Sequence, residues 1–372
     1  MDKKIIINTI RNNYIYYDDL EKNLTNKLDD LIGVEDSKFH RKFQDILDEI
    51  QDPHFKLIGS RKSRYTLPVY LGIFMDDIIV VEDSVNYPTI KKGLFLEGID
   101  DIKISDFLKK YKKYNTLSLK LMKILEGLTT RDSYGEVTFH FRSDKGNIIT
   151  EKVEYTKCIS AKVDMAEYWK SIEDYSVKIQ EKYGVVYYPF PSLMDELGVK
   201  RLKTNLERTT TENLILFDLR NNMGGRIDYA IDLVRFFVND NTNIFLKSRA
   251  GIKKHLLIPE KSNVRGKKIG MLFNNLTCSS LEFVFLRYVQ NIENIYLMGI
   301  PTCGMLDVAT LYNLDEKHTL SLSTKKYVDE NGNSIKERCI EPDIYINRGV
   351  NDIVDNRDTQ LEKALEFLRK GG

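Results

Sequence analysis

From about residue 180 onward the chain alternates short apolar strands with amphipathic helices, and this pattern restricts the possible folds more than any other feature. The apolar run Leu214–Leu219 has the composition of a strand buried in a parallel sheet. Other predicted strands and helices alternate around it, in the order strand Tyr183–Phe190, helix Ile227–Val238, strand Ile269–Phe273, helix Ser279–Val289 and strand Ile295–Met298, with a hairpin turn at Asn331-Gly332. Such alternation is typical of layered α/β domains, so we expect residues 158–372 to form an α/β core.

The first 157 residues follow two other patterns. Leucines at helical spacing, from Leu20 to Leu31, and a second apolar series from Phe43 to Ile50 predict a helical N-terminal segment within residues 1–64. Residues 65–157 contain short alternating runs separated by turn residues, and one helix is expected at Ser105–Gly127. The expected strands of this small β-rich module are Tyr65–Phe74, Ile78–Glu82, Glu136–Phe141 and Ile148–Tyr155.

Charge and composition exclude several classes of protein. The 372 residues include 56 basic and 55 acidic side chains, and no basic stripe stands out, so we expect no nucleic-acid partner. No stretch reaches the about 18–20 apolar residues that a membrane-spanning helix needs, and the N-terminus lacks the apolar run of a secretory signal. We therefore expect a soluble, cytoplasmic protein, unless a leader has been removed. The sequence does not indicate the oligomeric state.

The cysteines also argue against a metal site. The four residues Cys158, Cys278, Cys303 and Cys339 match neither the spacing of a zinc module nor a dense disulfide framework. Reduced thiols in a cytoplasmic protein explain them, and no metal or other cofactor is expected.

The segment Phe217–Gly225 is the first candidate for catalysis. It runs from an apolar strand into an amphipathic helix and ends in Gly224 and Gly225. Two glycines allow positive φ angles, so their N–H groups can point into a cleft and stabilise a developing negative charge. The alternative is a tight strand-to-helix turn without chemistry.

A second candidate is Ser279, which begins a predicted helix directly after a strand. The dipole at a helix N-terminus stabilises an anion that forms beside it, which suits a nucleophilic serine. However, Ser279 and Glu282 also have the spacing of a capping box, in which the serine hydroxyl only satisfies free N–H groups.

His54 and Glu337 complete the set of candidates. His54 follows the last N-terminal helix, and histidine is the natural general base near neutral pH. The chain has five histidines, so a role for any one of them needs support. A carboxylate such as Glu337 can orient a histidine, although a glutamate in a charged loop can equally be a solvated side chain.

Taken together, four segments in order resemble the C-terminal-processing (tail-specific) serine protease family. These segments are DLRNNMGG at 218–225, NNLTCSSLE at 274–282, GIPTCG at 299–304 and CIEPDIYI at 339–346. The resemblance implies a crotonase/ClpP-like core with Ser279 as the nucleophile. It also implies an oxyanion hole formed by the backbone N–H groups of Gly224 or Gly225 and of Ser280.

One departure points to a particular branch of that family. Where the bacterial tail-specific proteases have a lysine base, this chain has Met305, which cannot accept a proton. The resemblance is therefore to the Ser/His branch, which includes tricorn-like core proteases and nisin-resistance-type proteases. EIQDPHF at 49–55 resembles the Asp-x-His motif of that branch and makes His54 the base, and Glu337 falls where the tricorn-like proteases have a supporting glutamate. IKKGLFLEGIDDIKISDFL at 90–108 resembles a degenerate PDZ-like module.

The resemblance thus implies a serine peptidase that hydrolyses peptide bonds in peptides or protein tails through an acyl-enzyme. Two alternatives stay open: a non-catalytic peptide- or lipophile-binding member of the family, and a crotonase-type acyl-CoA enzyme. Only the peptidase requires Ser279. Cys278 is a weaker rival nucleophile.

Overall fold

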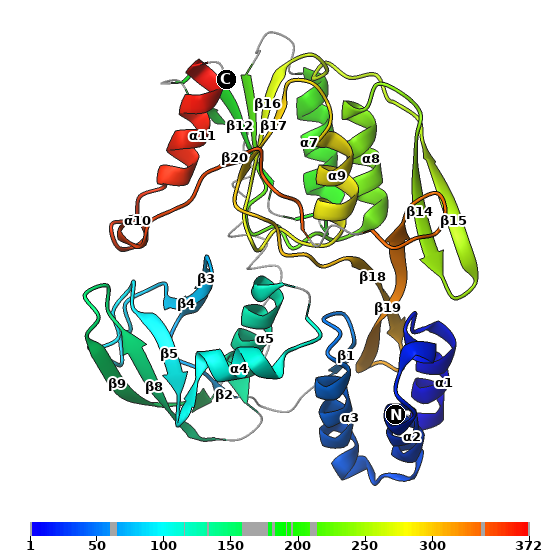
Figure 1. Cartoon of the computed structure of the whole chain (residues 1–372), viewed down its shortest axis with the longest axis vertical. Coiled ribbons are helices and arrows are strands. Elements are labelled where there is room, and N and C mark those ends of the chain that lie inside the picture. The colour runs from blue at the N-terminus through cyan, green and yellow to red at the C-terminus, as the bar shows by residue number, and fades with distance from the viewer. Residues whose placement is uncertain are drawn as a thin grey trace.

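The computed structural model describes residues 2–59, 65–114, 116–131, 134–157, 178–180, 183–190, 192–194, 196–208, 214–335 and 339–370. Figure 1 shows a mixed α/β molecule, with an α/β layer in the upper half, a β-rich module below it and the N-terminal helices beside the lower end of a long β-ribbon. The helices are too short or too polar to cross a membrane, in so far as the chain is described.

The N-terminal segment is helical, as predicted. It contains α1 (Lys3–Asn13), α2 (Lys22–Asp30) and α3 (Asp36–Ile50), with short 3-10 turns η1 (Tyr17–Asp19) and η2 (Leu31–Gly33). Asp2 begins α1, because its carboxylate accepts the N–H groups of Lys4 and Ile5. The apolar faces of these helices pack against one another and against Leu320 and Leu322 of β19 (His318–Val328). The segment therefore shares its hydrophobic core with the C-terminal half of the chain.

The middle of the chain is β-rich, as predicted, and its main sheet is antiparallel. The strand order is β3 (Leu71–Phe74), β4 (Asp77–Val80), β5 (Phe95–Ile99), β8 (Glu136–Arg142) and β9 (Ile148–Glu154), and β6 (Ile102–Lys103) pairs with β5. A second small sheet joins β10 (Thr156–Lys157), β2 (Tyr65–Thr66) and β7 (Thr130–Arg131). The strand predicted over 65–74 is interrupted at Pro68, which has no N–H to donate to a ladder.

The single helix predicted over 105–127 is wrong, because the chain forms α4 (Ile104–Lys110) and α5 (Leu117–Thr129) instead. Between them, Tyr114 turns inward and is only 6% exposed, in contact with the cluster that contains Leu119, Cys278 and Cys303. The free energy gained by burying this tyrosine against the C-terminal half exceeds what a continuous helix would gain at these residues.

The C-terminal half contains the expected α/β layer. Its sheet has the order β11 (Lys178–Gln180), β12 (Val185–Pro189), β13 (Leu214–Asp218), β16 (Lys268–Phe273), β17 (Ile295–Gly299) and β20 (Ile344–Tyr345). All neighbours from β12 to β20 are parallel, and β11 is antiparallel to β12. The predicted parallel sheet is therefore confirmed.

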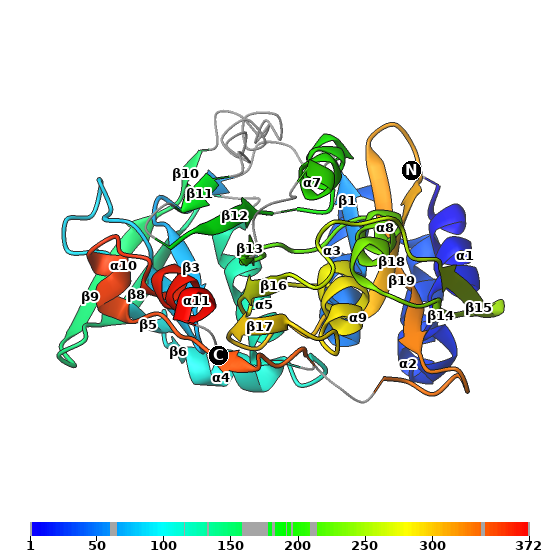
Figure 2. The same ribbon diagram turned by 90° about the horizontal axis from the view of Figure 1, so that it is seen from above.

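Helices cover both faces of this sheet (Figure 2). Phe217 and Met271 contribute to a core with helices on one face, and Leu216 and Leu272 pack against α11 (Thr359–Lys370) on the other. The helices of the first face are α7 (Glu196–Arg208), α8 (Ile227–Phe237), the π-helix η3 (Leu281–Leu286) and α9 (Arg287–Val289), and a short α10 (Val350–Val354) precedes α11. Alternate residues are thus buried on opposite faces, which explains the continuous apolar runs of the sequence.

A further antiparallel sheet connects the N-terminal segment to the α/β layer. Its order is β1 (Lys56–Gly59), β19, β14 (Thr242–Ser248) and β15 (Gly251–Leu257), and β18 (Asp307–Asn313) also pairs with β19. Lys56 of β1 lies opposite Ser321 of β19. Because β1 begins two residues after His54, this pairing fixes that histidine beside β19 and the start of β18.

Candidate active site

Ser279 lies on a strained turn between β16 and η3. Its φ angle is +60°, a left-handed conformation that costs a residue with a Cβ about 1–2 kcal/mol. The side chain is half-buried, and the Ser279 N–H donates to Glu282 Oε1 at 2.9 Å. A serine on such a strand-to-helix turn presents its hydroxyl at the edge of the sheet.

The predicted capping box is present only in half. Glu282 accepts the Ser279 N–H, but the Glu282 N–H donates to the Ser279 carbonyl and not to its hydroxyl. In the part of the chain that is described, Ser279 Oγ makes no hydrogen bond. The hydroxyl is therefore not used as a helix cap and is available for other chemistry.

Glu282 connects Ser279 to the segment that follows β17. Its carboxylate also accepts the N–H groups of Gly304, at 2.9 Å, and Met305, at 2.7 Å. The side chain is completely buried, and this burial raises the pKa of Glu282 to about 7, although the hydrogen bonds from Thr302 and the three N–H groups oppose the shift. One buried carboxyl thus fixes the two segments relative to each other.

The two glycines lie directly against the Ser279 turn. Gly224 and Gly225 have φ angles of +81° and +150°, and a Cβ on Gly224 would come within 2.6 Å of the Cys278 carbonyl oxygen. Glycine is therefore required for this approach. The Gly224 N–H donates to Asn222 Oδ1 at 2.9 Å, and the Gly225 N–H donates to Ser280 Oγ at 3.1 Å.

The predicted oxyanion donors thus differ in availability. Both glycine N–H groups are engaged by side chains, whereas the Ser280 N–H donates to no acceptor among the described residues. Ser280 Oγ also donates to the Gly225 carbonyl, at 3.0 Å. The structure brings Gly224, Gly225, Ser279 and Ser280 together in one turn region, and their catalytic roles stay a prediction.

Backbone and side-chain hydrogen bonds hold the glycine turn and the serine turn together. The Cys278 N–H donates to the Asn222 carbonyl at 3.0 Å, and the Thr277 hydroxyl donates to the Leu219 carbonyl at 2.9 Å. Next to them, the buried Arg220 pairs with Asp218 at 2.6 Å and with Asp358 at 2.7 Å. These contacts fix the two turns relative to each other.

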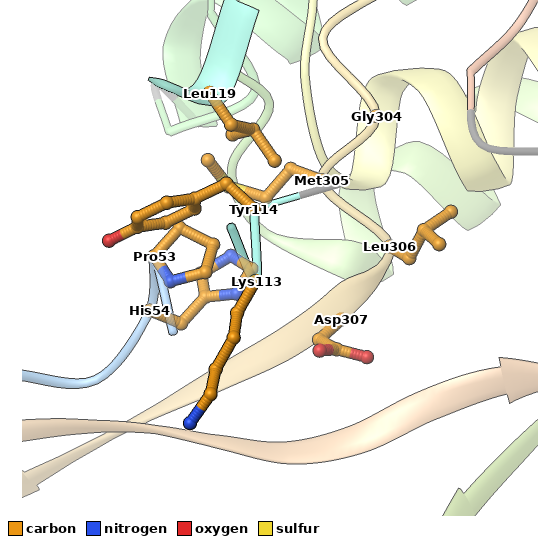
Figure 3. A pocket seen from close by; sticks show the side chains of 9 residues that line it. All are labelled: Pro53, His54, Lys113, Tyr114, Leu119, Gly304, Met305, Leu306 and Asp307. Atoms are coloured by element: carbon orange, nitrogen blue, oxygen red, sulfur yellow. The ribbon is translucent and has the colours of Figure 1, made fainter. Parts of the chain in front are cut away.

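His54 lies at a small pocket that three parts of the chain enclose (Figure 3). Pro53 and His54 come from the segment before β1. Lys113 and Tyr114 lie between α4 and α5, and Leu119 lies in the first turn of α5. Gly304, Met305 and Leu306 precede β18, and Asp307 is its first residue. The N–H of Gly304 and that of Met305 both donate to Glu282, which also accepts the Ser279 N–H. The pocket wall is therefore directly connected to the Ser279 turn.

Charged groups surround the imidazole of His54. Desolvation lowers the pKa of His54, and nearby Lys56 lowers it further, while the Asp52 carboxylate opposes both effects. On the other side of the pocket, burial and the nearby Asp52 raise the pKa of Asp307 to about 7. Tyr16 donates its hydroxyl to both oxygens of Asp307 at 2.9 Å.

The structure does not join all the predicted residues. No hydrogen bond links Ser279 to His54 within the described chain. Catalytic hydrogen bonds are often formed only when substrate is bound, so this geometry leaves the pair as a prediction. Glu337 and Cys158 lie outside the described residues. Cys278 is fully buried, and burial raises the pKa of its thiol well above the usual range, which does not suit a nucleophile.

Several residues of this region were not singled out in the sequence. Asp307, Ser323 and Tyr114 come from separate elements, and Glu282 was noted only as a helix-capping partner. Alternation of leucines with serines in β19 is typical of a strand with one solvated face, so the sequence carried no signal that Ser321 and Ser323 are buried. No group of three or more metal-ligating side chains occurs among the residues that the structure describes.

Comparison with known sequences places the central part of the chain among peptidases. Residues 182–346 match the family described as Peptidase family S41. The carboxy-terminal processing protease CtpA of Bacillus subtilis (strain 168) is 28% identical over 140 residues, which make up 38% of this chain and 30% of that protein. The carboxyl-terminal-processing protease of Synechocystis sp. (strain ATCC 27184 / PCC 6803 / Kazusa) is 25% identical over 169 residues, 45% of this chain and 39% of that protein. The match thus spans well under half of the length of either relative. The family match confirms the resemblance that the four motifs predicted.

Solved structures are similar over almost the whole chain. Mature CPAF has a TM-score of 0.72 at 14% identity, covering 99% of this chain and 95% of CPAF. The photosystem II D1 C-terminal processing protease has a TM-score of 0.54 at 12% identity, covering 99% and 97%. The tricorn protease has a TM-score of 0.52 at 13% identity, covering 99% of this chain and 36% of the tricorn chain. At these identities the similarity concerns the fold.

Proposed function

We propose, on the premise that residues 182–346 are a peptidase family S41 segment, that this protein is a serine peptidase of the Ser/His branch. Its substrates are peptides or exposed protein tails. Ser279 is the nucleophile and His54 is the general base. One observation carries this assignment: Ser279 has an unused hydroxyl on a left-handed turn, and Glu282 connects that turn to the wall of the His54 pocket.

In the proposed reaction, Ser279 Oγ attacks the carbonyl carbon of the scissile peptide bond while His54 removes the hydroxyl proton. The Ser280 N–H stabilises the tetrahedral oxyanion, and a glycine N–H joins it when the Asn222 or Ser280 side chain gives up its hydrogen bond. His54 then gives the proton to the leaving amine. An acyl-enzyme forms at Ser279, and a water molecule activated by His54 hydrolyses it.

Finer structural assignments belong to the same proposal. The parallel sheet with its flanking helices would be a crotonase/ClpP-like core of residues 158–372, and the sheet within 65–157 would be a degenerate PDZ-like module. Lys113, Tyr114 and Leu119 reach the pocket from that module, which supports a role for it in substrate access. Residues 1–64 would carry the base, and Glu337 would support it. A cytoplasmic location is part of the proposal too, and the buried free thiols of Cys278 and Cys303 are compatible with it.

Digestion of a diverse peptide library, analysed by mass spectrometry, tests the proposal. Wild type should cleave a defined set of peptides, and Ser279→Ala and His54→Ala should each abolish this cleavage. His255→Ala is the matched control, because His255 lies on β15, outside the pocket. A fluorophosphonate probe should in addition label wild type on the peptide that contains Ser279.

Each outcome decides between candidates. Cleavage by Ser279→Ala would overturn the assignment of the nucleophile, and cleavage by His54→Ala would overturn the assignment of the base. If wild type neither cleaves any peptide nor reacts with the probe, the chain is not a serine peptidase. A binding protein or a crotonase-type acyl-CoA enzyme would then be the better explanation.

A further inference from the structure

A chain of polar contacts behind His54 goes beyond the assignments above. Ser323 lies on β19 and is completely buried, and its Oγ is 3.0 Å from Asp52 Oδ1 and 3.4 Å from His54 Nδ1. Asp52 Oδ1 also accepts the backbone N–H of His54 at 2.8 Å. The hydroxyl of Ser323 thus lies between the histidine ring and a carboxylate two residues before it.

The direction of these hydrogen bonds follows from the atoms present. A carboxylate oxygen can only accept, so the short contact to Asp52 requires Ser323 to donate its single hydroxyl hydrogen there. Ser323 can then only accept from the imidazole. Nδ1 of His54 must therefore carry a hydrogen, and Nε2 has a lone pair.

This tautomer is the one that a general base needs. In the described structure His54 Nε2 makes no hydrogen bond, and the ring is among the side chains that line the pocket (Figure 3). A base that uses Nε2 gains from an acceptor at Nδ1, because the acceptor fixes the ring and stabilises the imidazolium that forms.

We propose that Ser323 and Asp52 form a hydroxyl-mediated relay that holds His54 in its Nδ1–H tautomer. Ser323 is a positioning residue, since it acts on the substrate only through His54. The effect of the relay on catalysis rests on the proposed function. The tautomer of His54 does not, because it can be observed in the protein without substrate. In the relay the carboxylate that orients His54 is Asp52, which the sequence places in the same short motif, and the relay does not require Glu337 for this role.

The surroundings favour a persistent relay. Ser323 cannot exchange its partners for water readily, because its side chain is inaccessible to solvent. The Ser323 carbonyl accepts the N–H of Ile15, and burial together with the nearby Asp52 carboxylate raises the pKa of Tyr14. Asp52 Oδ2 is buried and has no hydrogen-bond partner among the described residues. Oδ1 of the carboxylate thus accepts both from Ser323 and from the His54 N–H.

Nitrogen NMR of ¹⁵N-histidine-labelled protein tests the relay directly, with the His54 signals assigned by their loss in His54→Ala. Wild type should show the Nδ1–H tautomer of His54 at a pH where the ring is neutral. Ser323→Ala should shift the equilibrium toward Nε2–H, and Ser323→Thr, which keeps the hydroxyl, should restore the wild-type pattern. Ser321→Ala is the matched control: it changes a buried serine two residues away on the same strand, and Ser321 does not contact His54.

Kinetics on a cleaved peptide gives the second arm. Ser323→Ala should lower kcat/KM by at least about tenfold, mainly through kcat, and Ser323→Thr should recover most of the loss. Asp52→Asn, which keeps an acceptor but loses the charge, serves as the second variant if Ser323→Ala fails to fold, and its kcat should also fall.

The two arms separate the relay from the proposed function. An unchanged His54 tautomer in Ser323→Ala overturns the relay, even if wild type is a Ser279-dependent peptidase. A shifted tautomer in a protein that cleaves no peptide supports the relay and overturns the peptidase. Equal kinetic losses in Ser321→Ala and Ser323→Ala would assign the effect to strand packing and also contradict the relay.

Discussion

The Ser279 turn and the His54 segment are constructed differently, although both belong to the candidate site. The Ser279 turn is held by contacts between two neighbouring loops of the same parallel sheet, such as the bonds from Thr277 to Leu219 and from Cys278 to Asn222. His54 instead depends on partners from far along the chain, with Ser323 on β19 and Asp307 at the start of β18.

Because of this difference, the two regions should respond to different perturbations. The nucleophile turn stores local strain, since Ser279 adopts a left-handed conformation that glycine would adopt more easily. In the base segment the pKa of His54 is lowered by burial and that of Asp307 is raised by burial, so protonation of these groups should change its stability and activity. Substitutions in the first region should separate stability from activity. Changes of pH should affect the second region, and also Glu282, which joins the two.

The largest effect is expected at Ser279. Replacement by alanine should lower kcat by about 10³–10⁶-fold and leave the free energy of unfolding nearly unchanged, because the hydroxyl makes no hydrogen bond within the described chain. Ser279→Gly should be equally inactive but more stable than wild type by about 1 kcal/mol, since it removes the strain. Peptide-cleavage assays and urea unfolding measure both quantities. A Ser279→Gly protein less stable than Ser279→Ala would contradict the strain argument.

Glu282 tests whether the two regions depend on one connection. A glutamine there has one acceptor oxygen and an NH₂ group, so it cannot accept all the N–H groups of Ser279, Gly304 and Met305. Glu282→Gln should lower the free energy of unfolding by about 2–4 kcal/mol. The exposed Glu330→Gln, as a control, should change it by less than about 0.5 kcal/mol. A similarly small effect at Glu282 would show that the buried carboxyl is not needed to join these segments.

Asp307 provides the pH test of the base segment. Its pKa of about 7 in the folded protein lies above the ordinary value of 3.8, so the folded state binds the proton more tightly than the unfolded state does. The contribution of Asp307 to stability is therefore lost as the pH rises from about 4 to 7. Asp307→Asn should exceed wild type in free energy of unfolding at pH 8 by an amount of order 1–3 kcal/mol, and match it near pH 4. Urea unfolding at several pH values measures this, and a difference independent of pH would refute it.

The contrast between the two regions also explains what the sequence could predict. The Gly224-Gly225 turn and the Ser279 turn each consist of consecutive residues, so short motifs indicated both the local structure and the candidate chemistry. The N-terminal helices have apolar residues at helical spacing and the parallel strands are continuous apolar runs, and both predictions were confirmed. The break between α4 and α5 was not predicted, because burial of Tyr114 against the C-terminal half decides it. Likewise, Ser323 and Asp307 become relevant only when β19 and β18 pair with each other and β19 pairs with β1.

The smallest expected effect is the position of the pH profile. A general base must be neutral, and the pKa of His54 is lowered by burial and by Lys56, so kcat/KM should stay high at pH 6.5 and fall only below it. The charged or titratable groups around the ring are Asp52, Lys56, Lys113 and Asp307. Asp307 and Glu282 both have a pKa of about 7, so Asp307→Asn removes one of these two other ionisations from the profile.

A variant of Lys56 tests whether the acidic limb of kcat/KM comes from His54. It pairs with Glu126 at 3.0 Å on the surface and contributes positive charge near the imidazole. Lys56→Gln, made in the Asp307→Asn background, should raise the pKa of His54, so the acidic limb of kcat/KM should move to higher pH. The direction is decisive, because a cation near a base always favours the neutral form. An acidic limb that moves to lower pH, or stays unchanged, would mean that the titrating base lies elsewhere than at residue 54.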